Sequence, residues 1–242
     1  MLKLEARPEA SRFMSIASPL LALAITVVLG TILFIALGKD PMRGLYVFFI
    51  EPVKSAYALS ELAMKATPLL LIALGLSVCF RSNVWNIGAE GQFIVGAIFA
   101  SGVAMQAGPE TGRWIVVPVL LAGILGGMVW AGIVALLRDR FNASEILVSL
   151  MMVYIADMVL SYLVYGPWKD PAGYNFPQTI TFLKSTQVPR LFDGSRVNLG
   201  LPIALVLVAA FWVLLFRTYA GFQLQVGGLA PAAARYAGFS SR

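Results

Sequence analysis

The fold of this chain is decided by residues 82–92, which read Ser82-Asn83-Val84-Trp85-Asn86-Ile87-Gly88-Ala89-Glu90-Gly91-Gln92. This polar stretch has an apolar run on each side, Thr67 to Phe80 before it and Phe93 to Ala107 after it. Neither run comfortably reaches the roughly 20 apolar residues of a complete transmembrane helix. The pattern therefore predicts a helix that is broken near 82–92, with the freed backbone groups facing protein or a water-filled cavity.

The composition of the whole chain indicates an integral membrane protein. Charged residues make up only 12% of the sequence, which is about half the fraction of a soluble domain. Hydrophobic residues make up 59% of the chain, and its mean hydropathy is +0.82. A soluble fold of 242 residues could not bury this much apolar surface. The apolar segments are long and continuous, unlike the short alternating strands of a membrane barrel. We therefore predict an all-α polytopic membrane protein.

The residue types that are missing exclude several classes of function. The chain has no histidine, which removes the commonest general base and metal ligand. It has no P-loop sequence for ATP. The net charge of +6 fits anionic lipid headgroups better than nucleic acid. We expect a protein that is not an enzyme, holds no cofactor or metal, and has membrane lipid but no nucleic acid as a partner.

The apolar runs predict about six transmembrane helices in a single domain of residues 1–242, at 16–37, 67–80, 93–107, 114–137, 146–165 and 199–216. Residues 42–66 predict an amphipathic surface helix interrupted near Pro52.

Small residues recur every four positions in the 114–137 run, at Gly123, Gly127, Ala131 and Ala135. Such a stripe favours close helix packing over a substrate groove.

Charge decides the orientation poorly, because the basic residues divide evenly between the two sides. The compact 138–145 loop, with two arginines, slightly favours a cytosolic N-terminus at residues 1–14.

Glu90 is the sharpest candidate for function, because an ionisable group at membrane depth is a functional hypothesis by default. The competing interpretation, which we favour, is that Glu90 lies at the surface or stabilises the N-terminus of the helix that Gly91 and Gln92 open. The amides of Asn83, Asn86 and Gln92 either bind a polar solute or satisfy freed backbone groups. Transporters tend to place substrate sites at broken helices, so these four residues are candidates for a substrate pathway.

Asp157 lies in the middle of the 146–165 run. It either lines a pathway or pairs with Tyr154 or Ser161, one turn away on the same helix face. Packing or pairing is the favoured interpretation.

The tail predicts a short helix between Gly227 and Gly238. Pro231 suits its first position and Gly238 the position after its end. A helix this short is not stable alone, so its small alanine face needs a partner surface.

Two segments together, Asn86 to Gln92 and Ala232 to Gly238, resemble the permease subunits of bacterial ABC importers of the branched-chain amino acid and simple sugar class. Two others, Ser144 to Met151 and Gly166 to Pro171, look closer still to the nucleoside-type permeases served by basic membrane lipoproteins. The resemblance spans about residues 65–242.

The resemblance implies a mechanism and a set of partners. Two permease subunits, identical or different, form the pathway, separate cytosolic ATP-binding subunits drive it, and an extracytoplasmic lipoprotein delivers a nucleoside or a simple sugar. It places the tail 218–242 in the cytosol and loop 166–198 outside a bacterial inner membrane. Residues matching the ATPase-coupling helix of the family are Pro231, Ala233, Arg235, Tyr236, Ala237 and Gly238.

The sequence departs from this family in two ways. Ala230 stands where members usually have an asparagine N-cap, and an alanine side chain cannot accept the cap bond. Family chains also continue through further spans after this loop, so the resemblance implies a sequence that is C-terminally incomplete.

Two functions from other classes compete with the permease. An ion-coupled secondary transporter accounts equally for the broken helix but not for the tail. A membrane enzyme acting on lipids is disfavoured by one mid-span aspartate and no histidine.

Overall fold

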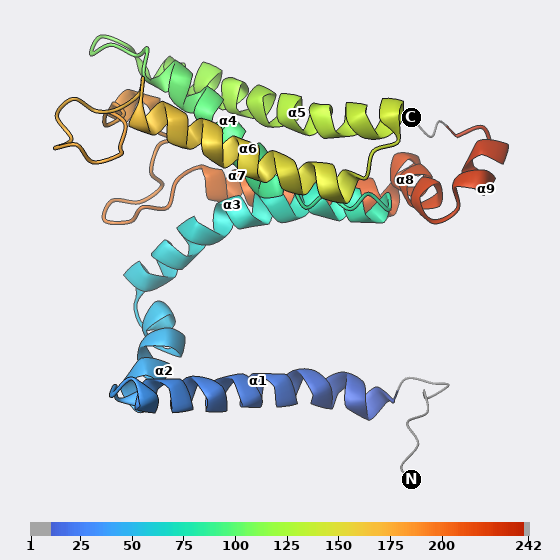
Figure 1. Ribbon diagram of the computed structural model, residues 1–242, viewed down its shortest axis with the longest axis horizontal. Coiled ribbons are helices and arrows are strands. Elements are labelled where there is room, and N and C mark those ends of the chain that lie inside the picture. Colours follow the sequence, from blue (N-terminus) through green and yellow to red (C-terminus); the bar gives the residue numbers. More distant parts are fainter. Residues whose placement is uncertain (1–10, 240–242) are drawn as a thin grey trace. The chain divides into compact units, whose positions relative to one another are not determined.

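The computed structural model describes residues 11–239, and within that range the chain is almost entirely helical (Figure 1). The described residues contain no β-strand, only an isolated bridge between Arg190 and Asn198. The all-α prediction is confirmed. The chain divides into two compact units, residues 1–62 and 63–242.

In the first unit, α1 (Arg12–Ala36) is followed by α2 (Pro41–Phe49) and the 3-10 helix η1 (Glu51–Val53). The Asp40 carboxylate begins α2 by accepting a hydrogen bond from the Met42 N–H at 2.9 Å, and Pro41 occupies the first helical position. Since α2 ends at Phe49, the predicted interruption near Pro52 is confirmed.

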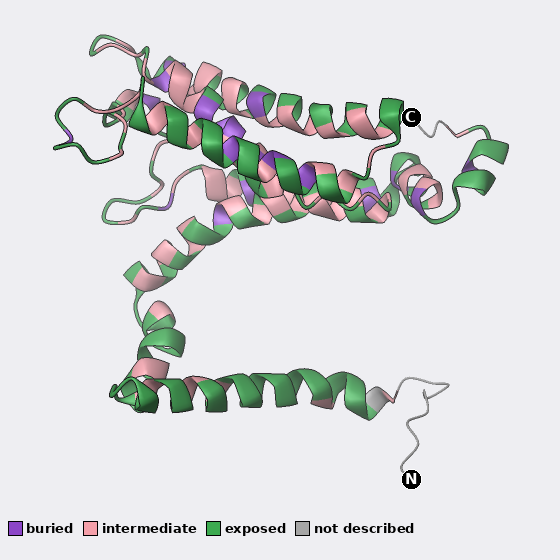
Figure 2. Ribbon diagram, viewed as in Figure 1, coloured by how far each residue is buried: buried purple, intermediate pink, exposed green. Residues whose placement is uncertain are grey.

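Helix α1 is apolar and almost fully exposed along its length (Figure 2). Residues Phe13–Ala36 have a mean hydropathy of 2.5. A helix that is hydrophobic on every side is stable against lipid or other protein, not against water. This composition fits a membrane span.

Helix α3 runs from Ala56 to Arg81, so one expectation from the sequence is wrong. Residues 56–66 do not belong to a surface helix but extend the 67–80 run into a helix of 26 residues. The charged side chains of Glu61 and Lys65 made residues 56–66 resemble a surface helix. Long polar side chains near the end of a membrane helix reach toward water, and Pro68 is tolerated inside such a helix.

The core of the second unit is α4 (Ala89–Ala104), which packs against α5 (Val116–Phe141) and α6 (Glu145–Tyr165). A Cβ atom added at Gly96 would lie 2.9 Å from the Gly123 carbonyl oxygen, and one at Gly127 would lie 3.3 Å from the Gln92 carbonyl oxygen. Helices α4 and α5 thus approach backbone to backbone. The packing role predicted for the small-residue stripe is confirmed at Gly123 and Gly127.

Five of the described helices are long and apolar enough to cross a membrane: α1, α3, the helix spanning Arg113–Phe141, α6 and α7 (Gly200–Arg217). Helix α4 is a shorter apolar helix of 16 residues, about 24 Å long against a hydrocarbon core of about 30 Å. These helices correspond to the six predicted runs, and the chain is a multi-pass membrane protein.

The helices of the second unit begin and end at two opposite sides of that unit. At one end, Trp168 packs on Gly102, and η2 (Arg113–Ile115) contacts η3 (Lys184–Thr186) of the 166–198 loop. At the other, the Arg81 guanidinium lies 4.0 Å from the centre of the Phe216 ring. Two further helices, α8 (Tyr219–Leu229) and α9 (Pro231–Tyr236), follow α7 at this second end.

Candidate functional site

The break between α3 and α4 covers residues 82–88, which Figure 1 shows as a thin trace between the two helices. The predicted break is confirmed but is shorter than 82–92, because α4 already begins at Ala89. Gly91 does not interrupt the helix. It is buried against α6, where an added Cβ would lie 3.0 Å from the Val153 Cα atom.

Asn83 ends α3 in a left-handed conformation, with φ of 55°. The Asn83 N–H donates to the Phe80 carbonyl at 3.1 Å, and the Val84 N–H donates to the Cys79 carbonyl at 2.9 Å. This is the Schellman arrangement, in which asparagine is the common substitute for glycine. The backbone of Asn83 therefore terminates the helix while its side chain is exposed.

Helix α4 begins inside the bundle and not at the level where α5 ends. The Gln92 carbonyl lies beside Gly127, and α5 continues from there to Phe141, roughly 20 Å further at 1.5 Å per residue. The break therefore carries non-helical backbone into the depth of the bundle.

Side chains satisfy the backbone groups that the break frees. The Ser149 hydroxyl, fully buried on α6, accepts a hydrogen bond from the Ile87 N–H at 3.2 Å. The Asn86 Oδ1 atom accepts one from the Gly88 N–H at 2.9 Å. Ser149 was not among the predicted site residues, and the available signal was its place in the Ser144 to Met151 segment that carries the family resemblance.

Asn86 and Gln92 also pair with each other. The Asn86 Nδ2 atom donates to Gln92 Oε1 at 3.4 Å, and the Gln92 Nε2 atom donates to Asn86 Oδ1 at 3.3 Å. Both side chains are half-buried. Asn86 thus satisfies freed backbone, as one of the two interpretations expected, while Gln92 keeps one amide N–H for another acceptor.

Glu90 lies in the first turn of α4 and is exposed. No hydrogen bond or ion pair joins its carboxylate to another described residue. A carboxylate at this position is stabilised by the positive end of the helix dipole. Both the stabilising role at this helix N-terminus and the role in a substrate pathway stay predictions for Glu90.

Asp157 is exposed on α6, about 12 Å along the helix from Ser149. Among the described residues it forms no hydrogen bond with Tyr154 or Ser161, so neither predicted pair is present. The side chains of Tyr154, Asp157 and Ser161 are all exposed on α6. The structure does not bring Asp157 to the break.

The predicted tail helix is present as α9. Pro231 is its first residue, and Gly238 follows its end with φ of 76°. The Gly238 N–H donates to Arg235 and the Phe239 N–H to Ala234, a second Schellman turn. Ala230 supplies no side-chain cap. Ala234 is 2% exposed, whereas all the predicted coupling residues are exposed: Pro231, Ala233, Arg235, Tyr236, Ala237 and Gly238.

Helix α8 was not predicted. The Thr218 hydroxyl begins it by accepting a hydrogen bond from the Gly221 N–H at 3.2 Å, and this N-cap was the available signal. Glycines at 221, 227 and 228 weigh against a helix by propensity. Packing overrides that cost, because Gly221 and Gly228 are buried where larger side chains would collide.

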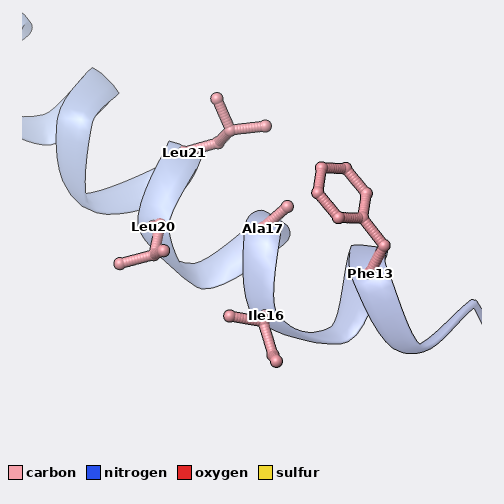
Figure 3. A pocket seen from close by; sticks show the side chains of 5 residues that line it. All are labelled: Phe13, Ile16, Ala17, Leu20 and Leu21. Atoms are coloured by element: carbon pink, nitrogen blue, oxygen red, sulfur yellow. The ribbon is translucent and has the colours of Figure 1, made fainter.

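A shallow pocket on α1 is lined by Phe13, Ile16, Ala17, Leu20 and Leu21 (Figure 3). All five side chains are apolar and come from one helix. A polar solute would find no hydrogen-bonding group there, so this pocket is not a candidate solute site. Within residues 11–239, no cluster of histidine, cysteine and carboxylates could hold a metal ion.

Comparison with known proteins identifies the family. Residues 58–242 match the family described as branched-chain amino acid transport system / permease component. The chain belongs to this family. The match covers the break, α8 and α9 as well as the long helices α5 to α7.

Individual relatives are sugar and nucleoside permeases. The chain is 32% identical to the glucose ABC transporter permease protein TsgB13 of Haloferax volcanii, over 99% of its own length and 65% of that protein. It is 28% identical to the nucleoside ABC transporter permease protein NupB of Lactococcus lactis, over 93% of its length and 64% of the relative. The guanosine ABC transporter permease protein NupP of Bacillus subtilis is 27% identical over the same shares.

The chain thus spans just under two thirds of the length of these curated relatives. No solved structure matches it.

Proposed function

We propose that this protein is the membrane-spanning translocation subunit of an ATP-driven importer for nucleosides or simple sugars. The relatives with glucose, nucleoside and guanosine in their names support both solute classes. In this proposal ATP is hydrolysed by separate subunits, and the chain moves solute by alternating access.

The observation that carries the proposal is α9. It is a six-residue helix, too short to be stable alone, yet only Ala234 is buried and the rest of its surface is exposed. A short helix with small exposed side chains at 233 and 237 suits a close-fitting groove on another protein. The cytosolic ATP-binding subunit is the partner that we assign to it.

The substrate pathway in this proposal passes the break. Non-helical backbone at membrane depth is tolerated only where it is buried in protein or lines a water-filled cavity. The residues assigned to the pathway are Asn83, Asn86, Glu90, Gln92 and Asp157. Amide N–H groups and the Glu90 carboxylate match the hydroxyl groups of nucleosides and sugars, which donate and accept hydrogen bonds. Asp157 lies away from the break, about 12 Å along α6 from Ser149.

The remaining assignments follow from the two ends of the second unit. With α9 in the cytosol, the 166–198 loop at the opposite end faces outward and meets a substrate-binding lipoprotein. The N-terminal residues 1–14 are then cytosolic, although 1–10 lie outside the described residues. A second permease subunit, identical or different, completes the pathway in a bacterial inner membrane.

The experiment measures how much of the ATP-binding subunit is retained on membranes that contain the Gly238→Val variant. A β-branched residue resists the left-handed conformation at 238, so the end of α9 should be distorted and retention and uptake should fall together. Gly194→Val is the matched control. Gly194 has φ of 81° and open space around it, but lies in the 166–198 loop.

Equal retention of the ATP-binding subunit by the two variants would show that α9 does not bind that subunit. The main support for an ATP-driven importer over an ion-coupled secondary transporter would then be lost.

A further inference from the structure

Three aromatic rings join the end of α9 to the start of α8. Phe239 packs edge-on against Tyr219 and Phe222, with ring centres 5.9 and 6.3 Å apart, and Tyr219 stacks on Phe222 at 6.3 Å. The Schellman turn at Gly238 directs the chain back so that Phe239 reaches these rings. We call residues 219–239 the α8–α9 hairpin. Because Phe239 contacts Tyr219 and Phe222, the residue after α9 is joined to the first turn of α8, and the two helices should move together.

The other end of α8 touches the break through backbone atoms. Gly228 is buried, and a Cβ added there would lie 2.6 Å from the Ser82 carbonyl carbon and 2.7 Å from the Arg81 carbonyl oxygen. Backbone atoms cannot rotate aside as a flexible side chain does. The neighbouring Gly227 has open space around it, with nothing within 4 Å of an added Cβ.

The residues that Gly228 contacts form the turn that begins the break. Ser82 follows the last residue of α3, and its hydroxyl donates to the Val78 carbonyl at 3.0 Å. Asn83 holds the left-handed conformation that ends the helix. From this turn the chain leads within a few residues to Asn86 and Glu90. A displacement of α8 at Gly228 therefore acts directly on the first residues of the break.

We infer that Gly228 is a positioning residue that passes movement of the ATPase-bound α9 to the broken-helix segment. When α9 is displaced, the ring cluster moves α8 with it, and the Gly228 backbone contact shifts the Ser82–Asn83 turn. The far end of the break is held on α6 through Ser149, so the shift changes the conformation of residues 83–88. This inference rests on the proposed function, because it needs an ATPase that binds α9.

The test compares Gly228→Ala with Gly227→Ala in the complete transport complex. Both changes add one methyl group to the same helix, and only the first places it against backbone. A reporter cysteine at Ile87→Cys, in a Cys79→Ser background, is labelled from water with and without ATP. Gly228→Ala should keep the ATP-binding subunit attached while the ATP-dependent change in labelling falls by about fivefold or more, the lower end of coupling between sites. Gly227→Ala should behave like the parent.

A second variant keeps the test decisive if Gly228→Ala does not accumulate in the membrane. Phe239→Ala removes the ring contacts without adding a clash, and it should reduce the ATP-dependent change in the same direction. An unchanged labelling response in Phe239→Ala, or equal responses in the two glycine variants, would overturn the inference while leaving the proposed function standing. A parent protein that neither retains the ATPase nor responds to ATP would overturn both.

Discussion

Replacing Ser149 with alanine should loosen the broken-helix segment without unfolding the bundle. The Ser149 hydroxyl is fully buried and accepts the hydrogen bond of the Ile87 N–H at 3.2 Å. It also donates to the Ile146 carbonyl at 3.2 Å within α6. Alanine removes the oxygen and leaves the Ile87 N–H without this partner.

The expected magnitude follows from that one donor. Ile87 is itself exposed, so the loss is that of a typical hydrogen bond, about 0.5–1.5 kcal/mol. Each 1.4 kcal/mol is a tenfold change in an equilibrium constant, so local opening of the segment should become about 2- to 12-fold more frequent. The packing of Gly88 against Ser149 should persist, because alanine keeps the Cβ atom that lies beside it.

Cysteine labelling measures this opening. A cysteine at Asn86, in a Cys79→Ser background, should be labelled faster from water in Ser149→Ala than in the parent. Ser161→Ala is the matched control, since Ser161 is on the same helix but exposed. Equal labelling rates in the two serine variants would refute the reasoning that Ser149 holds the break. Labelling by a lipid-phase reagent alone would show that the segment faces lipid.

Two further pairs of variants test the pathway and the packing around it. Glu90→Gln should reduce transport more than thermal stability, because it removes the charge and keeps the shape, whereas Glu90→Leu should reduce both; normal uptake by both variants would make Glu90 a surface residue. Gly96→Ala should lower the midpoint of thermal unfolding by the equivalent of about 1–3 kcal/mol, because its methyl group meets the Gly123 carbonyl 2.9 Å away. Gly132→Ala, with open space at the same kind of helical position, should leave the midpoint unchanged or raise it through better helix propensity. A fall of equal size in both glycine variants would show that α4 and α5 do not pack as described.

The sequence alone predicts much of this fold because its strongest signals are local. Proline at 231 and glycine at 238 delimit α9 by backbone chemistry, and the polar run after Phe80 locates the break. The length of α3 was not predictable from hydropathy, because Glu61 and Lys65 make its first turns look like a surface helix. Helix α8 was missed because close packing at Gly221 and Gly228 stabilises a segment whose propensity is poor.

The site was predicted less completely than the fold. The amides of Asn86 and Gln92 could be recognised from their place in the break, but their mutual pairing depends on the three-dimensional path of residues 86–92. Ser149 lies 62 positions away in the chain from the Ile87 N–H that it binds. Contacts between distant segments of this kind leave no trace in the periodicity of a single sequence.

The proposed function requires that ATP hydrolysis by a separate subunit drives solute through this chain. The most direct measurement is uptake of labelled nucleosides and glucose into vesicles that contain the complete transport complex, with ATP supplied to the ATP-binding subunit and an ionophore present. Uptake should require ATP, persist when ion gradients are collapsed, and be lost in Gly238→Val. Uptake that needs no ATP and stops when the ion gradient is collapsed would contradict the proposed function.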